Sequence, residues 1–309
     1  MRDRAIDSIR AIAIFFVVLG HVLIACEICP QLVGAIYSFH MPVLFSLSGY
    51  VISVAYERRP DALGRIRSSA LHLMVPYLIW SALIAPMCAS FLKGTSLAGE
   101  FSAALGYTFV TNHGMWYLPC CFLLICVYVG ADTLSRRWHF RLAFASAAFV
   151  ALALVLIGYW LTGIDFLRSV VCYWVSFFLG VAFARRRFTA ASVGWPLALL
   201  SSAVWSVLVL LPCTAGSALL KPITGALALL PLAWVAKRMN GRIVAGVWAI
   251  GESTLLIYGF DHAMGFLLAQ RLCPASLPIA VLWSVVVVVA IASLGKTWSA
   301  LVRTGRDLV

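Results

Sequence analysis

RAIAIFFVVLGHVLIACEICPQLVGAIYSFHMPVLFSLSGY, residues 10–50, reads as two long apolar segments joined by a short turn near Pro30. Three ionisable side chains interrupt these segments, at Arg10, His21 and His40. An ionisable group inside a membrane costs a few kcal/mol even on the mildest scales, so such residues are retained mainly where they have a function. We therefore expect this hairpin to organise both the fold and the site.

The spacing of these residues predicts where they lie. Eleven residues separate Arg10 from His21, so at about 100° per residue they fall within about 20° of one helix face, about 16 Å apart along the axis. If the chain turns at Pro30 and Gln31, antiparallel pairing brings His21 level with His40. The hairpin then carries a cation near one end and two imidazoles at a single depth.

The composition, 63% hydrophobic and 11% charged, lies far outside the range of soluble domains. The long apolar runs lack the alternation of barrel strands, and in lipid only helices or closed barrels satisfy the backbone. We predict an all-α, polytopic membrane protein formed by a single domain, residues 1–309. The predicted transmembrane helices, about ten of them, are 9–28, 32–55, 69–92, 115–134, 142–161, 166–184, 188–212, 217–236, 243–269 and 277–294.

Basic residues between these runs predict the orientation. If alternate loops are cytoplasmic, they carry 18 of the 23 lysines and arginines, while the opposite side carries four and Arg10 is set aside. Cytoplasmic loops are the ones enriched in such residues, so both termini are predicted to be cytoplasmic in a multi-pass protein of the inner (cytoplasmic) membrane. The net charge of +12 then reflects topology and contact with membrane lipid, and we expect no nucleic-acid partner.

The nine cysteines lie mostly within apolar runs, where a free thiol packs as a small apolar side chain. Cys26, Cys29, Cys213 and Cys273 fall near the predicted outer face, where pairing in an oxidising compartment is the alternative. No spacing typical of a metal site occurs, so we expect no metal and no permanently bound cofactor. The pattern does not predict an oligomeric state.

The first inner loop, ERRPDALGRIRSS, is the most basic segment of the chain. Arginines at a membrane face commonly contact lipid headgroups. The alternative is a pocket for a cytosolic donor that carries phosphate, because guanidinium groups bind phosphate in pairs. The residues of this predicted donor site are Arg10, Arg58, Arg59, Arg65, Arg67 and His72.

The fourth apolar run begins on the predicted outer side with a polar and aromatic group, His113, Trp116 and Tyr117. An interfacial Trp is typical of the aromatic belt of membrane proteins. The alternative is that these residues line a site for an acceptor, since aromatic faces suit sugar rings. Glu252, in the ninth apolar run, is a further candidate for acceptor binding.

The ninth apolar run contains IGESTLLIYGFDHAMG, which embeds Asp261 and His262 about eight residues below the predicted outer end. This is nearly the depth of the imidazoles in the first hairpin. A buried carboxylate needs a partner. The arrangement is expected if a carboxylate orients an imidazole base, whereas the alternative is a carboxylate paired with Arg10 that merely holds helices together.

Five segments of the chain, in order, resemble the membrane-bound acyltransferase family 3, in particular its fucose 4-O-acetylase-like branch. They are DSIRAIAIFFVVLGH, FHMPVLFSLSGYVIS, VPYLIW, MWYLPCCFLLICVY and ESTLLIYGF. The resemblance implies a ten-helix enzyme that moves an acyl group, commonly from acetyl-CoA, to a hydroxyl of a carbohydrate or glycolipid. It also implies that His21 is the catalytic histidine, Arg10 the first-helix arginine, and the first inner loop the donor-phosphate region.

Two positions depart from the pattern of that family. Its members usually carry an arginine four residues before the Pro of PY, where this chain has His72. Their late histidine commonly follows IY by three residues, where this chain has Asp261, with His262 next. Other inner-loop arginines would then have to complete the donor site, and His262 would face a different side of its helix.

The mechanism we predict places acyl-CoA at the inner face, with arginines holding its phosphates. His21 then acts as general base on the acceptor hydroxyl or as a transient acyl carrier, and His40 orients the acceptor or polarises the carbonyl. A rival from another class is a proton-coupled transporter or exporter, which would move its substrate along the same buried polar groups without consuming acyl-CoA. A non-catalytic scaffold would leave those groups without a purpose.

Overall fold

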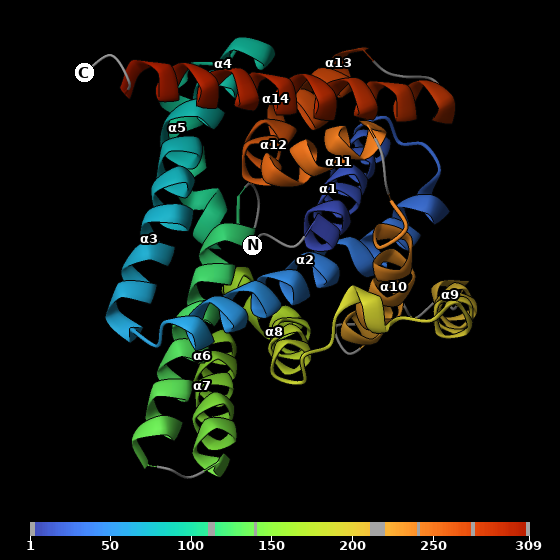
Figure 1. The fold of residues 1–309 in the computed structure, drawn as a ribbon. Helices are drawn as coiled ribbons and strands as arrows, with labels where there is room; N and C mark the ends of the chain where they lie inside the picture. Colours follow the sequence, from blue (N-terminus) through green and yellow to red (C-terminus); the bar gives the residue numbers. More distant parts are fainter. Residues whose placement is uncertain are drawn as a thin grey trace. The chain divides into compact units, whose positions relative to one another are not determined.

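The computed structural model describes residues 4–110, 115–138, 141–210, 220–239, 242–272 and 276–306. Throughout these ranges the regular elements are helices and no strand occurs, which confirms the predicted all-α class (Figure 1). Within them, seven helices are long and apolar enough to cross a membrane, so by helix composition the chain is a multi-pass membrane protein. These helices are Arg4–Ala25, Pro30–Arg58, Ala62–Lys93, Tyr117–Trp138, Phe144–Thr162, Asp165–Arg185 and Leu277–Thr297.

Three predicted runs take a different form from the one expected. The seventh and eighth form shorter apolar helices, α9 (Trp195–Leu210) and α10 (Leu220–Ala236). The ninth is divided into α11 (Arg242–Glu252), α12 (Thr254–Asp261), the π-helix η3 (His262–Leu267) and α13 (Leu268–Leu272). Gly251, Gly259 and Gly265 lie in this stretch, and glycine weakens a helix by about 1 kcal/mol relative to alanine, which favours the break.

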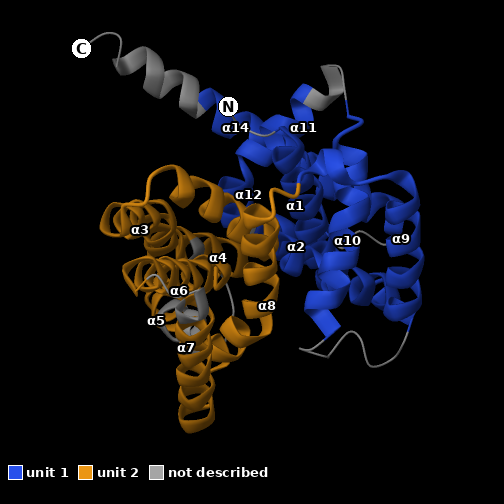
Figure 2. Cartoon of the chain, turned by 60° about the horizontal axis from the view of Figure 1, so that its bottom comes forward, with its two compact units in different colours: residues 1–44, 189–309 blue, residues 45–188 orange. Residues whose placement is uncertain are grey.

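The chain forms two compact units (Figure 2). Unit 1 comprises Met1–Leu44 and Thr189–Val309, and unit 2 comprises Phe45–Phe188. Helix α2 (Pro30–Arg58) gives its first half to unit 1 and its second half to unit 2.

Helix α1 (Arg4–Ala25) packs against many helices of unit 1. It contacts α10, α11, α12, η3, α13 and α14 (Leu277–Arg306). Most of its side chains from Ile9 to Leu23 are buried, because a helix that is apolar on all sides has to be covered on all sides. A turn over residues 26–29 follows it and leads into α2 at Pro30, so the turn is centred about three residues before the predicted position at Pro30 and Gln31.

Contacts along α1 fix its direction relative to the broken helix of the same unit. Near the start of α1, the Ser8 hydroxyl accepts a 3.1 Å hydrogen bond from Trp248 Nε1 of α11. Just beyond its end, the Cys26 thiol lies 3.8 Å from the carbonyl oxygen of Ala269 in α13. The two segments therefore run parallel, which is the direction expected if they are the predicted first and ninth crossings.

Unit 2 is built around α6 (Tyr117–Trp138), which contacts α3 (Ala62–Ile79), α7 (Arg141–Thr162) and α8 (Asp165–Arg185). A further helix, α5 (Leu97–Val110), lies between the predicted spans 69–92 and 115–134. A short helix of this kind is stabilised mainly by packing against its neighbours.

The third predicted run starts and bends at identifiable residues. Asp61 caps α3, its carboxylate accepting a 3.0 Å hydrogen bond from the backbone N–H of Gly64. Pro76 removes one backbone donor near the other end of α3. The π-helix η1 (Trp80–Ile84) follows and continues into α4 (Ala85–Lys93). The run is therefore longer and less regular than the predicted span 69–92.

Helices α2 and α8 approach so closely in unit 2 that their backbones touch. A Cβ atom on Gly49 would collide with the carbonyl of Phe177, and one on Gly180 would collide with the carbonyl of Ser46. The Ser46 hydroxyl also donates a 2.8 Å hydrogen bond to the Ser176 carbonyl. Small residues that allow such an approach are typical of helix pairs in membranes.

Candidate active site

His21 lies four residues before the end of α1, in a segment whose other side chains are mostly buried. One third of its side-chain surface, 33%, remains exposed. Gly20 precedes it, and the ring of Tyr37 from α2 packs against that glycine so closely that a Cβ there would lie 3.0 Å from the ring. The imidazole is thus accessible while its surroundings are tightly packed.

Asp261 is the last residue of α12, directly before the π-helix η3. Its side chain is only 2% exposed. Gly265, one turn later, leaves room for this carboxylate, because a Cβ at that position would collide with Asp261 Oδ1. A π-helix widens the turn and is often found at functional sites. Here it accompanies a carboxylate that is buried and held toward α1.

The carboxylate of Asp261 and Nδ1 of His21 form a short hydrogen bond within unit 1. Because a carboxylate only accepts, Nδ1 carries the hydrogen, and in the neutral ring Nε2 is left with its lone pair. A buried carboxylate on one imidazole nitrogen, with part of the ring accessible, is the arrangement of a general base whose tautomer is fixed. The structure therefore brings together two residues that the sequence had placed only at nearly the same depth.

His40 and His21 lie on either side of an aromatic ring that the pattern did not single out. The Tyr37 ring centroid is 6.3 Å from that of His21 and 4.8 Å from that of His40. His40 is buried, and its Nδ1 donates a 2.6 Å hydrogen bond to the Ile36 carbonyl, one turn back in α2. Tyr37 was missed because an aromatic residue in an apolar helix carries no polar signal.

Arg10 lies on α1, one continuous helix with His21, as their spacing required. Its guanidinium is 3.9 Å from the carboxylate of Asp7, which is 5% exposed, and 26% of the Arg10 side chain is exposed. The expected alternative, a pairing of Arg10 with a late carboxylate, is not among its contacts in the described residues. Arg4 stacks on the ring of Trp248 at 4.3 Å.

The other predicted donor residues lie in unit 2, at the end of α2 and along α3. Arg58, Arg59 and Arg67 are exposed, and Arg65 donates a 3.0 Å hydrogen bond to the Ala55 carbonyl. His72 is also exposed and bonds the Ser68 carbonyl through Nδ1, at 3.2 Å. These residues are available to a ligand, but the structure does not gather them around one point.

Trp116 and Tyr117 belong to an aromatic cluster inside unit 2. The rings of Phe45, Trp116 and Tyr173 stack, with centroids 4.7 to 6.1 Å apart. Tyr117 meets Phe45 edge to face at 4.8 Å, and its hydroxyl is 2.7 Å from that of Ser48. The cluster holds the start of α6 against α2 and α8.

The structure describes the remaining predicted site residues in less detail. Glu252 ends α11 and is exposed. His262 begins η3, but its side chain lies outside the described part of the structure, as does the whole of His113. Among the residues that are described, no group of three His, Cys, Asp or Glu side chains is arranged to hold a metal ion.

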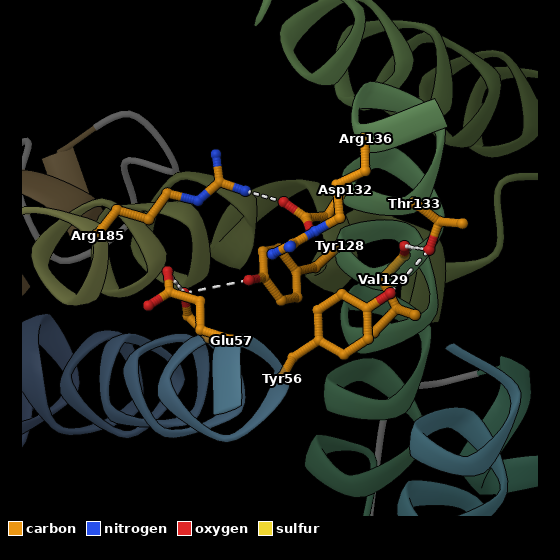
Figure 3. Close-up of polar contacts among 9 residues, drawn as sticks. Tyr56, Glu57, Tyr128, Val129, Asp132, Thr133, Arg136 and Arg185 are labelled. Carbon is orange, nitrogen blue, oxygen red and sulfur yellow. Dashed lines mark hydrogen bonds and ion pairs between the residues drawn. The ribbon is translucent and has the colours of Figure 1, made fainter. Parts of the chain in front are cut away.

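One polar cluster in unit 2 was not predicted at all. Asp132 of α6 binds two arginines, Arg136 of the same helix and Arg185 of α8 (Figure 3). The arginines were assigned only to membrane topology, and Asp132 lay near the edge of its apolar run. An acidic residue four positions before an arginine was the available signal.

The comparison with family models gives a match over residues 3–300 to the family described as "Acyltransferase domain" (Acyl_transf_3). Nodulation protein NolL of Sinorhizobium fredii is 32% identical over 169 residues, which cover 49% of this chain and 42% of that protein. NolL of Mesorhizobium japonicum is 34% identical over 91 residues, covering 27% of this chain and 24% of that protein. Both alignments span less than half of the relative's length, and no solved structure matches.

The family match extends over nearly the whole chain and so includes both members of the His21–Asp261 pair. It confirms the resemblance to this family that the five segments suggested, and it favours acyl transfer over the transporter alternative. The family assignment implies an acyl donor and an acceptor. The chain belongs to the acyltransferase 3 family.

Proposed function

We propose that this acyltransferase is an O-acetyltransferase that moves an acetyl group from cytosolic acetyl-CoA to a hydroxyl of a cell-envelope or exported carbohydrate. The observation that carries the proposal is the contact between the buried carboxylate of Asp261 and Nδ1 of His21. Acyl transfer to a hydroxyl needs a base of this kind, because a neutral hydroxyl is a weak nucleophile toward a thioester.

In this proposal His21 is the general base. Its Nε2 takes the proton of the acceptor hydroxyl while the hydroxyl oxygen attacks the thioester carbonyl, and the carbon–sulfur bond breaks to release the CoA thiolate. Asp261 stabilises the imidazolium that forms and keeps the hydrogen on Nδ1. His40 and His262 are proposed to assist by orienting the acceptor. The proton then passes from His21 to the departing sulfur, which restores the base.

The proposed topology has about ten crossings of the inner membrane, with both termini cytoplasmic and the whole chain acting as one domain. Arg10 then lies toward the cytosol and His21 toward the outer half of the same helix. The donor phosphates would be held by Arg10 and by residues of the first inner loop and α3, namely Arg58, Arg59, Arg65, Arg67 and His72. The acceptor would approach from the outer side, past His113, Trp116, Tyr117 and Glu252.

Mass spectrometry of the surface glycans tests this function. Cells that express the chain should carry glycans heavier by one acetyl group per modified sugar than cells that lack it, and saponification with mild base should remove the difference. Cells that express an Asp165→Asn variant at the same level are the control, because Asp165 is exposed at the start of α8 and belongs to neither the proposed base nor the proposed binding sites. Unmodified glycans in all strains, with the protein present in the membrane, would contradict the proposed acceptor class.

A further inference from the structure

A buried carboxylate joins two arginines from different helices where α6 and α8 end in unit 2 (Figure 3). Arg136 Nε donates to Asp132 Oδ2 at 2.5 Å, and Arg185 Nη2 donates to the other oxygen, Oδ1. The Asp132 side chain is 9% exposed, whereas those of Arg136 and Arg185 are 49% and 35% exposed. The carboxylate is therefore enclosed, and the two guanidinium groups lie between it and the solvent.

Aromatic rings and hydroxyls hold this cluster in place. The Arg185 guanidinium lies 4.1 Å from the Phe144 ring centroid and 5.8 Å from that of Tyr128, and Arg136 lies 5.8 Å from the ring of Tyr56. Stacking of this kind restrains a planar guanidinium and adds a favourable contact.

The two tyrosines are fixed in turn by hydrogen bonds. The Tyr56 hydroxyl is 2.9 Å from that of Thr133, and the Tyr128 hydroxyl donates to Ser53 at 3.1 Å. A binding group held by such a supporting layer loses little freedom when a ligand arrives. The arginine pair is thus ordered before any ligand binds.

Arg136 and Arg185 have N–H donors that Asp132 does not use. Asp132 uses one nitrogen of each guanidinium, although each group offers five N–H donors in a planar fork. Asp132 offsets one of the two guanidinium charges, and Glu57, which accepts a 3.5 Å hydrogen bond from Ser53, is a second carboxylate in the same view (Figure 3).

The wider surroundings are rich in arginine and not in lysine. The helix ends that meet here, residues 55–67, 132–137 and 185–187, contain nine arginines, three acidic residues and no lysine. Positive charge at helix C-termini and at the cytoplasmic face would be supplied equally well by lysine. The choice of arginine, together with two forks fixed on one carboxylate, matches the requirements of phosphate, which is bound by paired N–H donors.

We propose that Arg136 and Arg185, held by Asp132, bind a phosphate group. The same chemistry is found in the nucleotide part of an acyl-CoA donor and in the phosphodiester of an anionic lipid. Assignment to the donor rests on the proposed function, and it adds two residues that are absent from the donor site predicted from the first inner loop. The phosphate site itself rests only on the geometry of the cluster.

The test is a binding measurement on the full chain in nanodiscs, with free CoA as the probe so that no acyl transfer is needed. In discs of neutral phosphatidylcholine, Arg136→Lys and Arg185→Lys should each weaken CoA binding about ten-fold or more, because lysine keeps the charge but not the paired donors. Arg137→Lys is the matched control, an exposed arginine next in sequence to Arg136, and should bind as the wild type does.

A second arm measures how much phosphatidylglycerol the same proteins retain from mixed discs, by native mass spectrometry. Loss of retained phosphatidylglycerol in both variants, with CoA binding unchanged, supports the phosphate site and assigns it to a lipid. If neither ligand is affected, or if Arg137→Lys has the same effect, the proposal is overturned. Thermal melting checks that each variant folds. If Arg185→Lys does not fold, the result for Arg136→Lys, at a half-exposed position, decides the test. Because neither arm measures turnover, unmodified glycans would count against the proposed function and not against this site.

Discussion

At the scale of the residue, the burial of Asp261 is the feature that most needs an explanation. One carboxylate oxygen binds His21, and the other has no hydrogen-bond partner among the described residues. A carboxylate in such surroundings is costly unless a partner compensates for its charge. The buried carboxylate of Asp261 then has a function, because it stabilises the imidazolium that forms when the partly accessible His21 takes a proton.

Replacing Asp261 with Asn should therefore lower acyl transfer on the order of a hundred-fold to ten-thousand-fold, with little change in the amount of folded protein. The amide has nearly the same shape but no charge, and it no longer enforces the tautomer with hydrogen on Nδ1. Initial rates with purified protein measure the effect. Asp165→Asn, an exposed position in the first turn of α8, is the control and should retain full activity. A rate close to wild type for the Asp261 variant would remove that residue from the mechanism.

Gly20→Ala tests the packing beside the same imidazole without changing any charge. The new Cβ would lie 3.0 Å from the Tyr37 ring and 3.2 Å from Ile36 Cγ2, so these side chains have to shift next to His21. Misplacement of a catalytic group by a fraction of an ångström is expected to lower the rate about ten-fold. The rate of acyl transfer, measured beside the melting temperature, separates this from unfolding. An unchanged rate would show that the ring position is irrelevant.

Residues of this site were predictable to different degrees from the sequence. His21 and Asp261 could be found because ionisable groups stand out in apolar runs and their depths could be counted. Tyr37 could not, since a buried aromatic residue is expected in any apolar helix. Asp132 was overlooked because neighbouring arginines have a sufficient explanation in topology, and only the folded chain brings Arg185 to it.

At the scale of the element, the long apolar runs predicted the helical class correctly but not the interruptions of the helices. A π-helix and the α-helices that flank it have similar composition, so the break that follows Asp261 leaves only a weak trace in the glycines nearby. Contacts between helices are equally hard to predict. The approach of α2 to α8 depends on two glycines that are far apart in the sequence, Gly49 and Gly180.

Alanine at Gly49 or at Gly180 should destabilise the protein by about 1 to 3 kcal/mol or more, because the added methyl group meets a carbonyl of the facing backbone, which cannot move as a side chain can. The matched control is Gly130→Ala in α6, where nothing lies within 4 Å of the new atom. That change should be neutral or stabilising by up to about 1 kcal/mol. Melting temperatures in detergent give the comparison, and equal effects at all three positions would contradict close packing of α2 on α8.

At the scale of the whole molecule, the helix directions within each unit agree with the topology that was predicted from the charges of the loops. In unit 1, α1 and the α11–α13 segment run parallel, as two odd-numbered crossings should. In unit 2, contacts of Tyr56 with Thr133 and of Asp132 with Arg185 bring the ends of α2, α6 and α8 together, as three even-numbered crossings should. In the proposed topology, the basic residues at those ends share one side of the membrane.

The orientation can be measured with a fluorescent reporter that matures only in the cytosol. Fused after the last residue of the chain, it should fluoresce, and fused at Ser96, between α4 and α5, it should not, since that point follows three predicted crossings. Alkaline phosphatase, which is active only outside the cytosol, should give the opposite result at both positions. Fluorescence at Ser96 with none at the C-terminus would invert the proposed topology and place His21 toward the cytosol.

The central claim is that His21 is the base of an acetyl transfer, and one measurement tests it most directly. Membranes that contain the wild-type chain or His21→Ala, at equal protein levels, are incubated with acetyl-CoA labelled in the acetyl group and with cell-envelope carbohydrate, and the label on the carbohydrate is counted. We predict base-labile label with the wild type and a loss on the order of a thousand-fold or more with the variant. Transfer by the variant at a rate near that of the wild type would contradict the account.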